Sequence, residues 1–179
     1  LIRLVWPTRD DSDLREDAKL SLLARVVRIR LQEVMREKLG QAYSPSARSE
    51  TSSTWTDYGT FSVNVAVDFS QLDPALNAIT DLIGGLAEEL SDDLLDRARQ
   101  PLLESYSNML KSLSGWMSLT DDAQSRPERL RRYDELPSLL VSISADEIRN
   151  VATRYLSPSD AVEFLVVPSE ATKELDLDI

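Results

Sequence analysis

The stretch LREDAKLSLLARVVRIRLQEVMREKLG, residues 14–40, decides the fold because it predicts one long helix with apolar residues on two sides. Asp13 is followed three residues later by Glu16, a spacing that resembles a capping box and predicts the start of the helix. Gly40 predicts its end, since glycine adopts at little cost the positive φ that is common just after a helix. A helix of about 27 residues is roughly 40 Å long.

Two apolar strips run along this predicted helix when successive residues are placed 100° apart. The main strip should lie on a sheet and comprises Leu20, Leu23, Ala24, Val27, Leu31, Val34 and Met35. The second, narrower strip comprises Leu22, Val26 and Ile29. A helix that covers only one sheet does not need the second strip, so we expect a further helix or another domain to pack there. Beside the second strip, away from the main one, lie Arg25, Arg28, Gln32 and Arg36. Arg36 should therefore not point into the core.

Several segments have the pattern of β-strands. Residues 1–6 are a short apolar run closed by Pro7, and residues 41–50 and 161–168 also predict strands. The clearest strand is 61–67, in which Phe and Val alternate with Ser, Asn and Ala at a period of two. The turn SSTWTD joins the second and third predicted strands into an antiparallel hairpin.

Helices are predicted between the hairpin and the last strand. Asp73–Pro74 have the order of an N-cap and a first-turn proline, so a helix should follow as far as Leu90. Ser91 should cap the next helix, and Pro101 should kink that helix rather than end it. Residues 102–124 are predicted to continue as helical structure.

The fold class follows from the order of these elements. Ser144 and Glu147 form a second capping box, for a helix that ends near Leu156 and precedes the last strand. The order is strand, helix, strand, strand, several helices, strand. It indicates an α+β fold, a two-layer sandwich with a mixed, mainly antiparallel sheet and helices packed on one face.

Composition excludes several classes of function. With a net charge of −11, the chain lacks the basic surface that nucleic acids need, so we expect no nucleic-acid partner. It contains no His and no Cys, the usual zinc ligands, so we expect no metal site and no cofactor within it. No apolar run approaches the ~20 residues of a membrane span. Because Leu1 is not an initiator Met, we expect the chain to be a piece of a longer protein.

Acidic and aromatic clusters have simple structural interpretations. Neither acidic cluster has the glycine and terminal Glu of a calcium-binding loop, so both are interpreted as acids that complement a helix N-terminus. The two clusters are Asp10, Asp11, Asp13 and Asp92, Asp93, Asp96. Large apolar side chains at helical spacing are interpreted as core. These are Tyr106, Trp116 and Met117.

Arg36 and Tyr43 are the candidate site residues at the end of the long predicted helix. A cation in the last turn of a helix is favourable by up to ~1 kcal/mol, which by itself accounts for Arg36. Tyr is a common strand residue, which by itself accounts for Tyr43. No glycine-rich phosphate loop and no Gly-x-Ser-x-Gly elbow accompanies them in the sequence.

Motifs in a fixed order over most of the chain resemble one family. They are MREKLGQAYSP from Met35, DYGTFSVNVAVD from Asp57, LSDDLLDRARQPLLES from Leu90 and SADEIRNVATRYLSPSDAVEFLVVP from Ser144. Together they resemble the insulinase-like (pitrilysin) family of zinc metallopeptidases. The third motif has its Ala and Arg, Ala98 and Arg99, at the positions found in the matching helix of that family.

The resemblance implies which half of such an enzyme this chain is. In the family, zinc is held in the N-terminal half by an inverted His-x-x-Glu-His motif and a distant Glu. A chain without His resembles the zinc-free C-terminal half, with zinc expected in the N-terminal half or a partner subunit. That half carries an Arg and a Tyr seven residues apart that reach toward the substrate, and Arg36 and Tyr43 have this spacing. The implied roles are binding of peptide carbonyl or carboxylate groups by Arg36 and donation to a developing oxyanion by Tyr43.

The expected function is a non-catalytic, substrate-binding C-terminal domain of a zinc peptidase. The alternative is an inactive assembly subunit of the same family without substrate contact. A third interpretation, an unrelated α+β ligand-binding module, has no positive feature in its favour. The expected partners are a zinc-bearing half or subunit and a peptide substrate. Residues 1–168 would form one domain without zinc ligands, and residues 169–179 an acidic tail.

Overall fold

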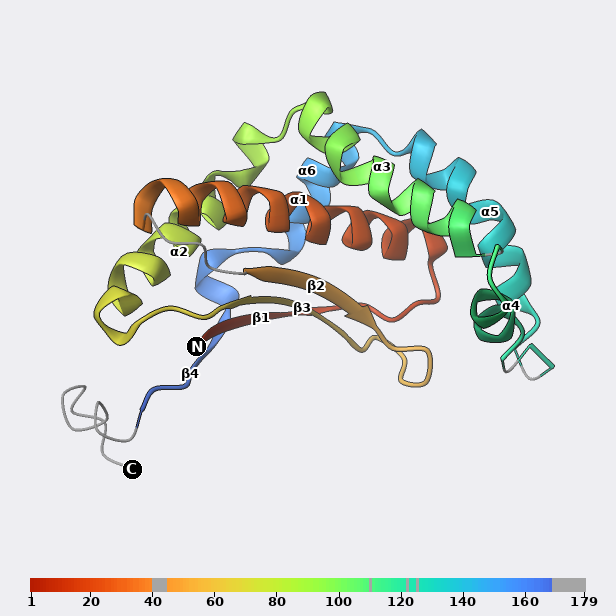
Figure 1. Cartoon of the computed structure of the whole chain (residues 1–179), viewed down its shortest axis with the longest axis horizontal. Coiled ribbons are helices and arrows are strands. Elements are labelled where there is room, and N and C mark those ends of the chain that lie inside the picture. Colours follow the sequence, from red (N-terminus) through yellow and green to blue (C-terminus); the bar gives the residue numbers. More distant parts are fainter. Residues whose placement is uncertain (40–44, 110, 122, 125, 169–179) are drawn as a thin grey trace.

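A four-stranded sheet lies under a layer of helices (Figure 1). The computed structural model describes residues 1–39, 45–109, 111–121, 123–124 and 126–168. The strand order is β2-β3-β1-β4, with bounds β1 Ile2–Thr8, β2 Ser46–Thr51, β3 Gly59–Val65 and β4 Val162–Leu165. The predicted α+β sandwich is confirmed. Each pairing among the described strands is antiparallel, whereas the prediction allowed a mixed sheet.

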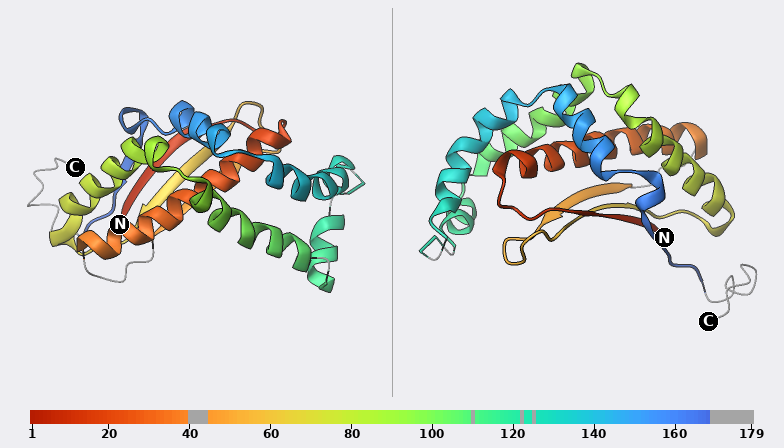
Figure 2. Two further views of the ribbon diagram at one scale, coloured as in Figure 1. Left: turned by 90° about the horizontal axis from the view of Figure 1, so that it is seen from above. Right: turned by 180° about the vertical axis from the view of Figure 1, so that it is seen from behind.

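The helices cover one face of the sheet and extend beyond its end (Figure 2). Their bounds are α1 Leu14–Leu39, α2 Leu72–Glu89, α3 Asp92–Met109, α4 Leu113–Thr120, α5 Glu128–Ser142 and α6 Ala145–Tyr155, with short 3-10 turns at Phe69–Gln71 and Pro158–Asp160. Helices α1, α2 and α6 lie over the strands, whereas α4 and α5 lie beyond them. We call α4 and α5 the arm. Pro101 lies inside α3 and does not end it, as predicted.

The two central strands, β1 and β3, supply the floor of the core. Their inward residues pair across the sheet as Ile2 with Val65, Leu4 with Val63 and Trp6 with Phe61. All six side chains are buried, which confirms the period-two pattern of the predicted strands. The rings of Trp6 and Phe61 meet edge to face, with centroids 6.3 Å apart, and Trp6 Nε1 donates to the Ser157 carbonyl at 2.8 Å.

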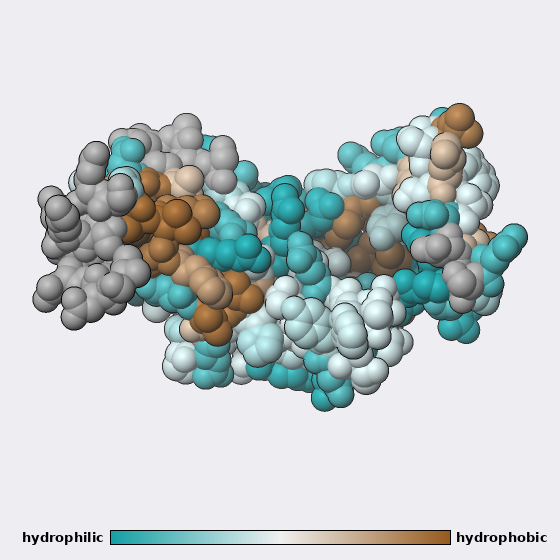
Figure 3. All heavy atoms as spheres, turned by 90° about the horizontal axis from the view of Figure 1, so that it is seen from below, coloured by the Kyte–Doolittle hydropathy of each residue, from teal (hydrophilic) through white to brown (hydrophobic). Residues whose placement is uncertain are grey.

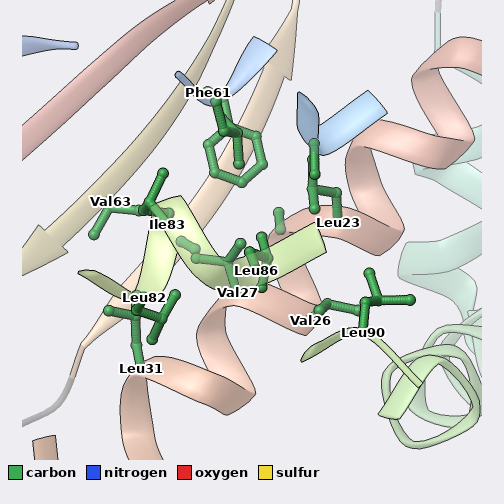
Figure 4. Close-up of a cluster of buried hydrophobic side chains, with 14 of the residues drawn as sticks. Leu23, Val26, Val27, Leu31, Phe61, Val63, Leu82, Ile83, Leu86 and Leu90 are labelled. Atoms are coloured by element: carbon green, nitrogen blue, oxygen red, sulfur yellow. The ribbon is translucent and has the colours of Figure 1, made fainter. Parts of the chain in front are cut away.

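Helix α1 is buried on both of its predicted apolar strips. On the main strip Leu23, Val27 and Leu31 have no exposed surface, and on the second strip neither do Leu22 and Val26. Figure 4 shows residues of the main strip gathered with side chains of β3 and α2, and Val26 beside Leu90 after the end of α2. Helices α2, α3, α5 and α6 all contact α1. The second strip is therefore covered by helices of the same chain.

The N-terminus of α1 departs from the prediction in one respect. Asp13 Oδ1 accepts from the backbone N–H groups of Arg15 and Glu16 at 2.9 and 3.1 Å, so Asp13 is the cap. The Glu16 carboxylate instead accepts from Arg154 Nη1 at 2.8 Å and Tyr155 Oη at 3.2 Å. The reciprocal half of the predicted capping box is therefore wrong, because Glu16 connects α1 to the end of α6.

Arginines of one helix close the C-terminal ends of others. Arg99 of α3 donates to the carbonyls of Leu140 and Ile143 at the end of α5, at 2.9 and 2.6 Å. Arg149 of α6 donates to the Leu90 carbonyl that follows α2, at 2.6 Å. The last carbonyls of a helix lack intrahelical partners and carry partial negative charge, so a guanidinium satisfies both needs. These contacts fix the helices of the upper layer to one another.

A bidentate ion pair joins the starts of α1 and α6. Arg15 Nε and Nη2 each donate to a carboxylate oxygen of Glu147 at 2.9 Å. The same carboxylate accepts from the backbone N–H of Ser144 at 3.1 Å, which completes the predicted capping box of α6. The hydrogen bonds from Arg15 lower the pKa of Glu147 from 4.5 to about 2, with a smaller contribution from the Ser144 N–H.

Replacing Trp6 with Ala should lower the free energy of unfolding by about 3–5 kcal/mol, because a fully buried ring leaves a cavity. The matched control is Trp55→Ala, since the Trp55 side chain is 70% exposed and its loss should change stability by less than about 0.5 kcal/mol. Urea unfolding followed by circular dichroism measures both. Equal losses in the two variants would contradict the core described above.

Replacing Glu147 with Gln should lower the free energy of unfolding at neutral pH by about 1–2 kcal/mol, because charge-assisted hydrogen bonds are lost. A lowered carboxyl pKa stabilises the fold above the unfolded pKa. This contribution is lost as the pH falls from about 4.5 to about 2. Urea unfolding at a series of pH values should therefore show a weaker acid dependence in the variant. Glu104→Gln, at an exposed carboxylate, should retain the acid dependence of the unaltered chain.

Candidate functional site

Arg36, the first candidate site residue, lies in the last turn of α1 with its side chain exposed. No other described residue forms a hydrogen bond or ion pair with its guanidinium. Its neighbour Lys38, by contrast, lies with Nζ 3.5 Å from Asp81 Oδ2 of α2. Arg36 is therefore on the solvent side of the helix, as the two-strip analysis predicts, with its donors available to a ligand.

Tyr43, the second candidate, and Gly40 belong to residues 40–44, which lie outside the part of the chain that the structure describes. The predicted pairing of Arg36 with Tyr43 therefore stays a prediction. Strand β2 begins at Ser46, two residues after this segment. Arg36 therefore lies in the last turn of α1, and Tyr43 lies in the sequence between the end of α1 and the start of β2.

Arg36 continues a row of cations along α1. Arg25 and Arg28 lie on the same side of the helix, with Gln32 between them and Arg36. Arg28, Gln32 and Arg36 are exposed, whereas Arg25 is half-buried. Burial, and to a lesser degree the nearby Arg28 guanidinium, lower the pKa of Arg25. Sequence reasoning placed this row beside the second apolar strip but assigned a role only to Arg36.

A hollow of about 560 Å³ lies between the arm, α3 and the start of α1. Its apolar lining includes Leu14, Leu102, Tyr106, Met109 and Leu136. Seen from below, apolar side chains lie in a recess beside the arm (Figure 3). Arg36 is not among the residues that line this hollow.

The charged groups of this hollow are already used by the fold. Asp11 Oδ2 accepts from Arg126 Nη2 at 3.1 Å and Arg132 Nη1 at 3.2 Å. Asp17 accepts from Thr51 Oγ1 at 2.7 Å, and burial raises the pKa of its carboxyl. The Asp11 contacts fasten the arm to the segment just before α1, and the Asp17 contact joins α1 to the end of β2. They account for these carboxylates without a ligand.

The interpretation of Tyr106, Trp116 and Met117 as core residues is wrong in part. The Trp116 and Met117 side chains of α4 are 49% and 64% exposed. Tyr106 is half-buried, and its ring lies against that of Tyr133 with centroids 5.7 Å apart. Helix α4 is short and lies beyond the sheet, so it has too little surface to cover every apolar residue at helical spacing.

Residues 2–102 match the sequence profile of a known family, described as the inactive domain of peptidase M16. This match covers more than half of the 179 residues. The chain belongs to the M16 peptidase family as an inactive domain. The resemblance to insulinase-like zinc metallopeptidases is thereby confirmed. No curated protein sequence matches the chain significantly.

Solved structures share the fold of this M16 inactive domain at low sequence identity. The inactive peptidase domain of a candidate zinc protease from Bordetella parapertussis has a TM-score of 0.75 and 17% identity, over 94% of this chain and 90% of that one. A candidate zinc protease from Bordetella pertussis Tohama I gives 0.74 and 16%, over 94% and 92%. A chain of complex III2 from Candida albicans gives 0.71 and 12%, over 90% of this chain but 41% of that one.

The M16 inactive domain shows no metal centre in its described residues. There, no group of three or more His, Cys, Asp or Glu side chains is placed to hold a metal ion. Several acids of the two clusters have structural partners: Asp10 accepts from Ser12 and from the Asp57 N–H, Asp13 caps α1, and Asp96 pairs with Arg99. Asp92 and Asp93 lie in the first turn of α3, where acids complement the helix N-terminus. Any zinc would be in the other half of an M16 enzyme. Among the described helices, none is long and apolar enough to cross a membrane.

Proposed function

We propose that this M16 inactive domain is the substrate-binding, non-catalytic part of a zinc peptidase, in which Arg36 and Tyr43 contact the peptide. The observation that supports the proposal is the exposed Arg36 guanidinium at the end of α1, which has no partner among the described residues. Within this proposal, residues 1–168 form the domain and residues 169–179 an acidic tail, while a zinc-bearing half or partner subunit supplies the metal.

The chemistry of the two side chains suits a peptide held at a zinc ion elsewhere. A guanidinium has several donors in a fixed plane and a permanent charge, so it can bind peptide carbonyls or a terminal carboxylate. A phenol can donate to a carbonyl oxygen as negative charge develops on it during attack by water. Zinc would activate that water and polarise the same carbonyl. The domain would therefore stabilise the transition state without holding the metal.

In the intact peptidase, with its zinc-bearing half, Tyr43→Phe should lower kcat by about 10²–10³-fold, the usual effect of losing one oxyanion donor. Arg36→Gln should raise KM, because it removes a contact made to bound substrate as well as to the transition state. Steady-state hydrolysis of a fluorogenic peptide measures both parameters. Thermal unfolding of each variant tests whether the fold is retained.

The chain offers matched controls for both substitutions. Tyr58→Phe changes a tyrosine that is 59% exposed, and Arg9→Gln changes an exposed arginine outside α1. Both controls should leave kcat and KM within about twofold of the unaltered enzyme. The proposal fails if Tyr43→Phe lowers stability as much as it lowers kcat, because Tyr43 would then be a residue of the core.

Residues 1–179 alone should not hydrolyse a fluorogenic peptide, with or without added zinc, because the chain has no His and no Cys to hold the ion. The measurement is the fluorescence increase at high enzyme concentration, compared with a chelator-treated sample. Cleavage that a chelator abolishes would show that the chain holds a catalytic metal and would overturn its role as a non-catalytic part.

An assembly subunit without substrate contact is the second candidate function. It is supported by the similarity to a chain of complex III2 from Candida albicans, a protein assembly. In that case Arg36→Gln and Tyr43→Phe would leave kcat and KM of the associated enzyme unchanged. The kinetic comparison described above therefore separates the two functions.

A further inference from the structure

A groove follows the outer edge of strand β2, the outermost of the described strands, beside helices α1 and α3. We call it the edge groove; it holds a hollow of about 300 Å³ lined by Ser21, Ala24, Arg25, Arg28, the consecutive residues 47–50 and Leu102. In a strand, successive side chains point to opposite faces of the sheet. Because four consecutive residues of β2 line the hollow, it must run along the edge of the strand rather than over one face.

The edge groove contains arginines without partners. Arg25 and Arg28 of α1 and Arg48 of β2 line it, and none of the three forms an ion pair or hydrogen bond with another described residue. Arg25 and Arg28 also line a second hollow of about 360 Å³ that continues the groove beside Pro101 of α3. Glu50 is an acid in the same lining, toward the end of β2.

Most arginines outside the edge groove are paired; among the described residues the exceptions are Arg3, Arg9 and Arg36. Arg15, Arg99, Arg126 and Arg149 each pair with a carboxylate or with helix carbonyls. Arg25 is half-buried beside Arg28, so two like charges are close together, and neither forms an ion pair with a described residue. Within a chain of net charge −11, such a cluster is unfavourable for the folded state alone and suits an anionic partner.

The strand edge supplies a second recognition element. Strand β2 is the outermost strand of the described sheet, so alternate backbone N–H and C=O groups of β2 point away from β3. An extended peptide can add to such an edge through main-chain hydrogen bonds. The opposite edge, β4, instead presents the exposed apolar side chains of Val162 and Phe164, followed by Val166 (Figure 3). The exposed Arg3 of β1 lies opposite Phe164.

We propose that the edge groove binds an extended acidic peptide segment, which pairs with β2 as an added strand and places carboxylates against Arg25, Arg28 and Arg48. The β2 backbone selects an extended main chain, and the arginines select Asp or Glu side chains. This proposal does not require Arg36 or Tyr43 to act at a zinc site. The peptide-binding proposal and the proposed function can therefore fail independently of each other.

The first test is equilibrium binding by residues 1–179. The probe is a fluorescein-labelled peptide of alternating Glu and Thr, followed by fluorescence anisotropy. The double substitution Arg25→Gln/Arg28→Gln should weaken binding by about tenfold or more, because it removes charge-assisted hydrogen bonds. The matched control, Arg3→Gln/Arg9→Gln, changes two unpaired arginines outside the groove and should weaken binding by no more than about twofold. Equal loss in both double variants, or no binding of the probe, overturns the proposal.

Stability distinguishes a binding role from a structural one. Removing two neighbouring like charges should leave the thermal midpoint of Arg25→Gln/Arg28→Gln unchanged or higher. A fall in the midpoint that parallels the loss of binding would show that these arginines support the fold. A peptide of alternating Lys and Thr serves as a charge control, and its binding should not depend on Arg25 or Arg28.

Strand addition is tested with N-methylated probes. Methylation of every second amide of the Glu-Thr peptide removes the donors of one edge of the added strand. One set of methylated positions should abolish binding, and the alternative set should retain it. Equal binding by both sets contradicts pairing with β2. If sedimentation shows a dimer that Arg25→Gln/Arg28→Gln dissociates and that excludes the probe, the occupant is a second copy and the peptide proposal is wrong.

Discussion

Helix α1 must hide apolar side chains on two opposite sides, and this constraint organises the domain. Leu23 and Val27 need the sheet, whereas Leu22 and Val26 need a cover on the other side, and all four have no exposed surface. Burial of one such side chain stabilises the fold by about 1.5–3 kcal/mol, so neither side can be left to water. The upper helices are therefore part of the same core, and the open flank of α1 carries Arg25, Arg28 and Arg36.

Two groups of arginines in the domain have different physical roles. Arg99 and Arg149 donate to carbonyls at helix ends, and Arg15 forms a bidentate pair with Glu147. The guanidinium N–H groups of these arginines are used in contacts that hold the fold together. Arg25 and Arg28, on the open flank of α1, have no partner among the described residues. Because an unpaired, partly buried cation does not stabilise a fold, this second group is better explained by recognition than by stability.

Elements with a strong periodic pattern could be predicted from the sequence, and elements with a weak pattern could not. The two strips of α1 and the alternation of Phe61 to Val65 were decisive because burial enforces each period. Helix α5 was not predicted, since its charged segment with Pro137 lacks a clear apolar strip and depends on tertiary partners such as Arg99. Glu16 has the spacing of a capping box, but its carboxylate accepts hydrogen bonds from Arg154 and Tyr155 instead. Arg36 could be placed on the open flank of α1, whereas the position of Tyr43 depends on a segment outside the described residues.

The net charge of −11 does not oppose recognition of anionic groups by the open flank of α1. At physiological ionic strength the screening length is about 8 Å, so carboxylates on distant helices contribute little at the groove. Arg25 and Arg28 lie within reach of anything in the groove and are half-buried and exposed, respectively. Short-range donors therefore determine which ligand is held. A domain without zinc ligands can thus select among peptides through local arginines, although its overall charge resembles that of a non-binding scaffold.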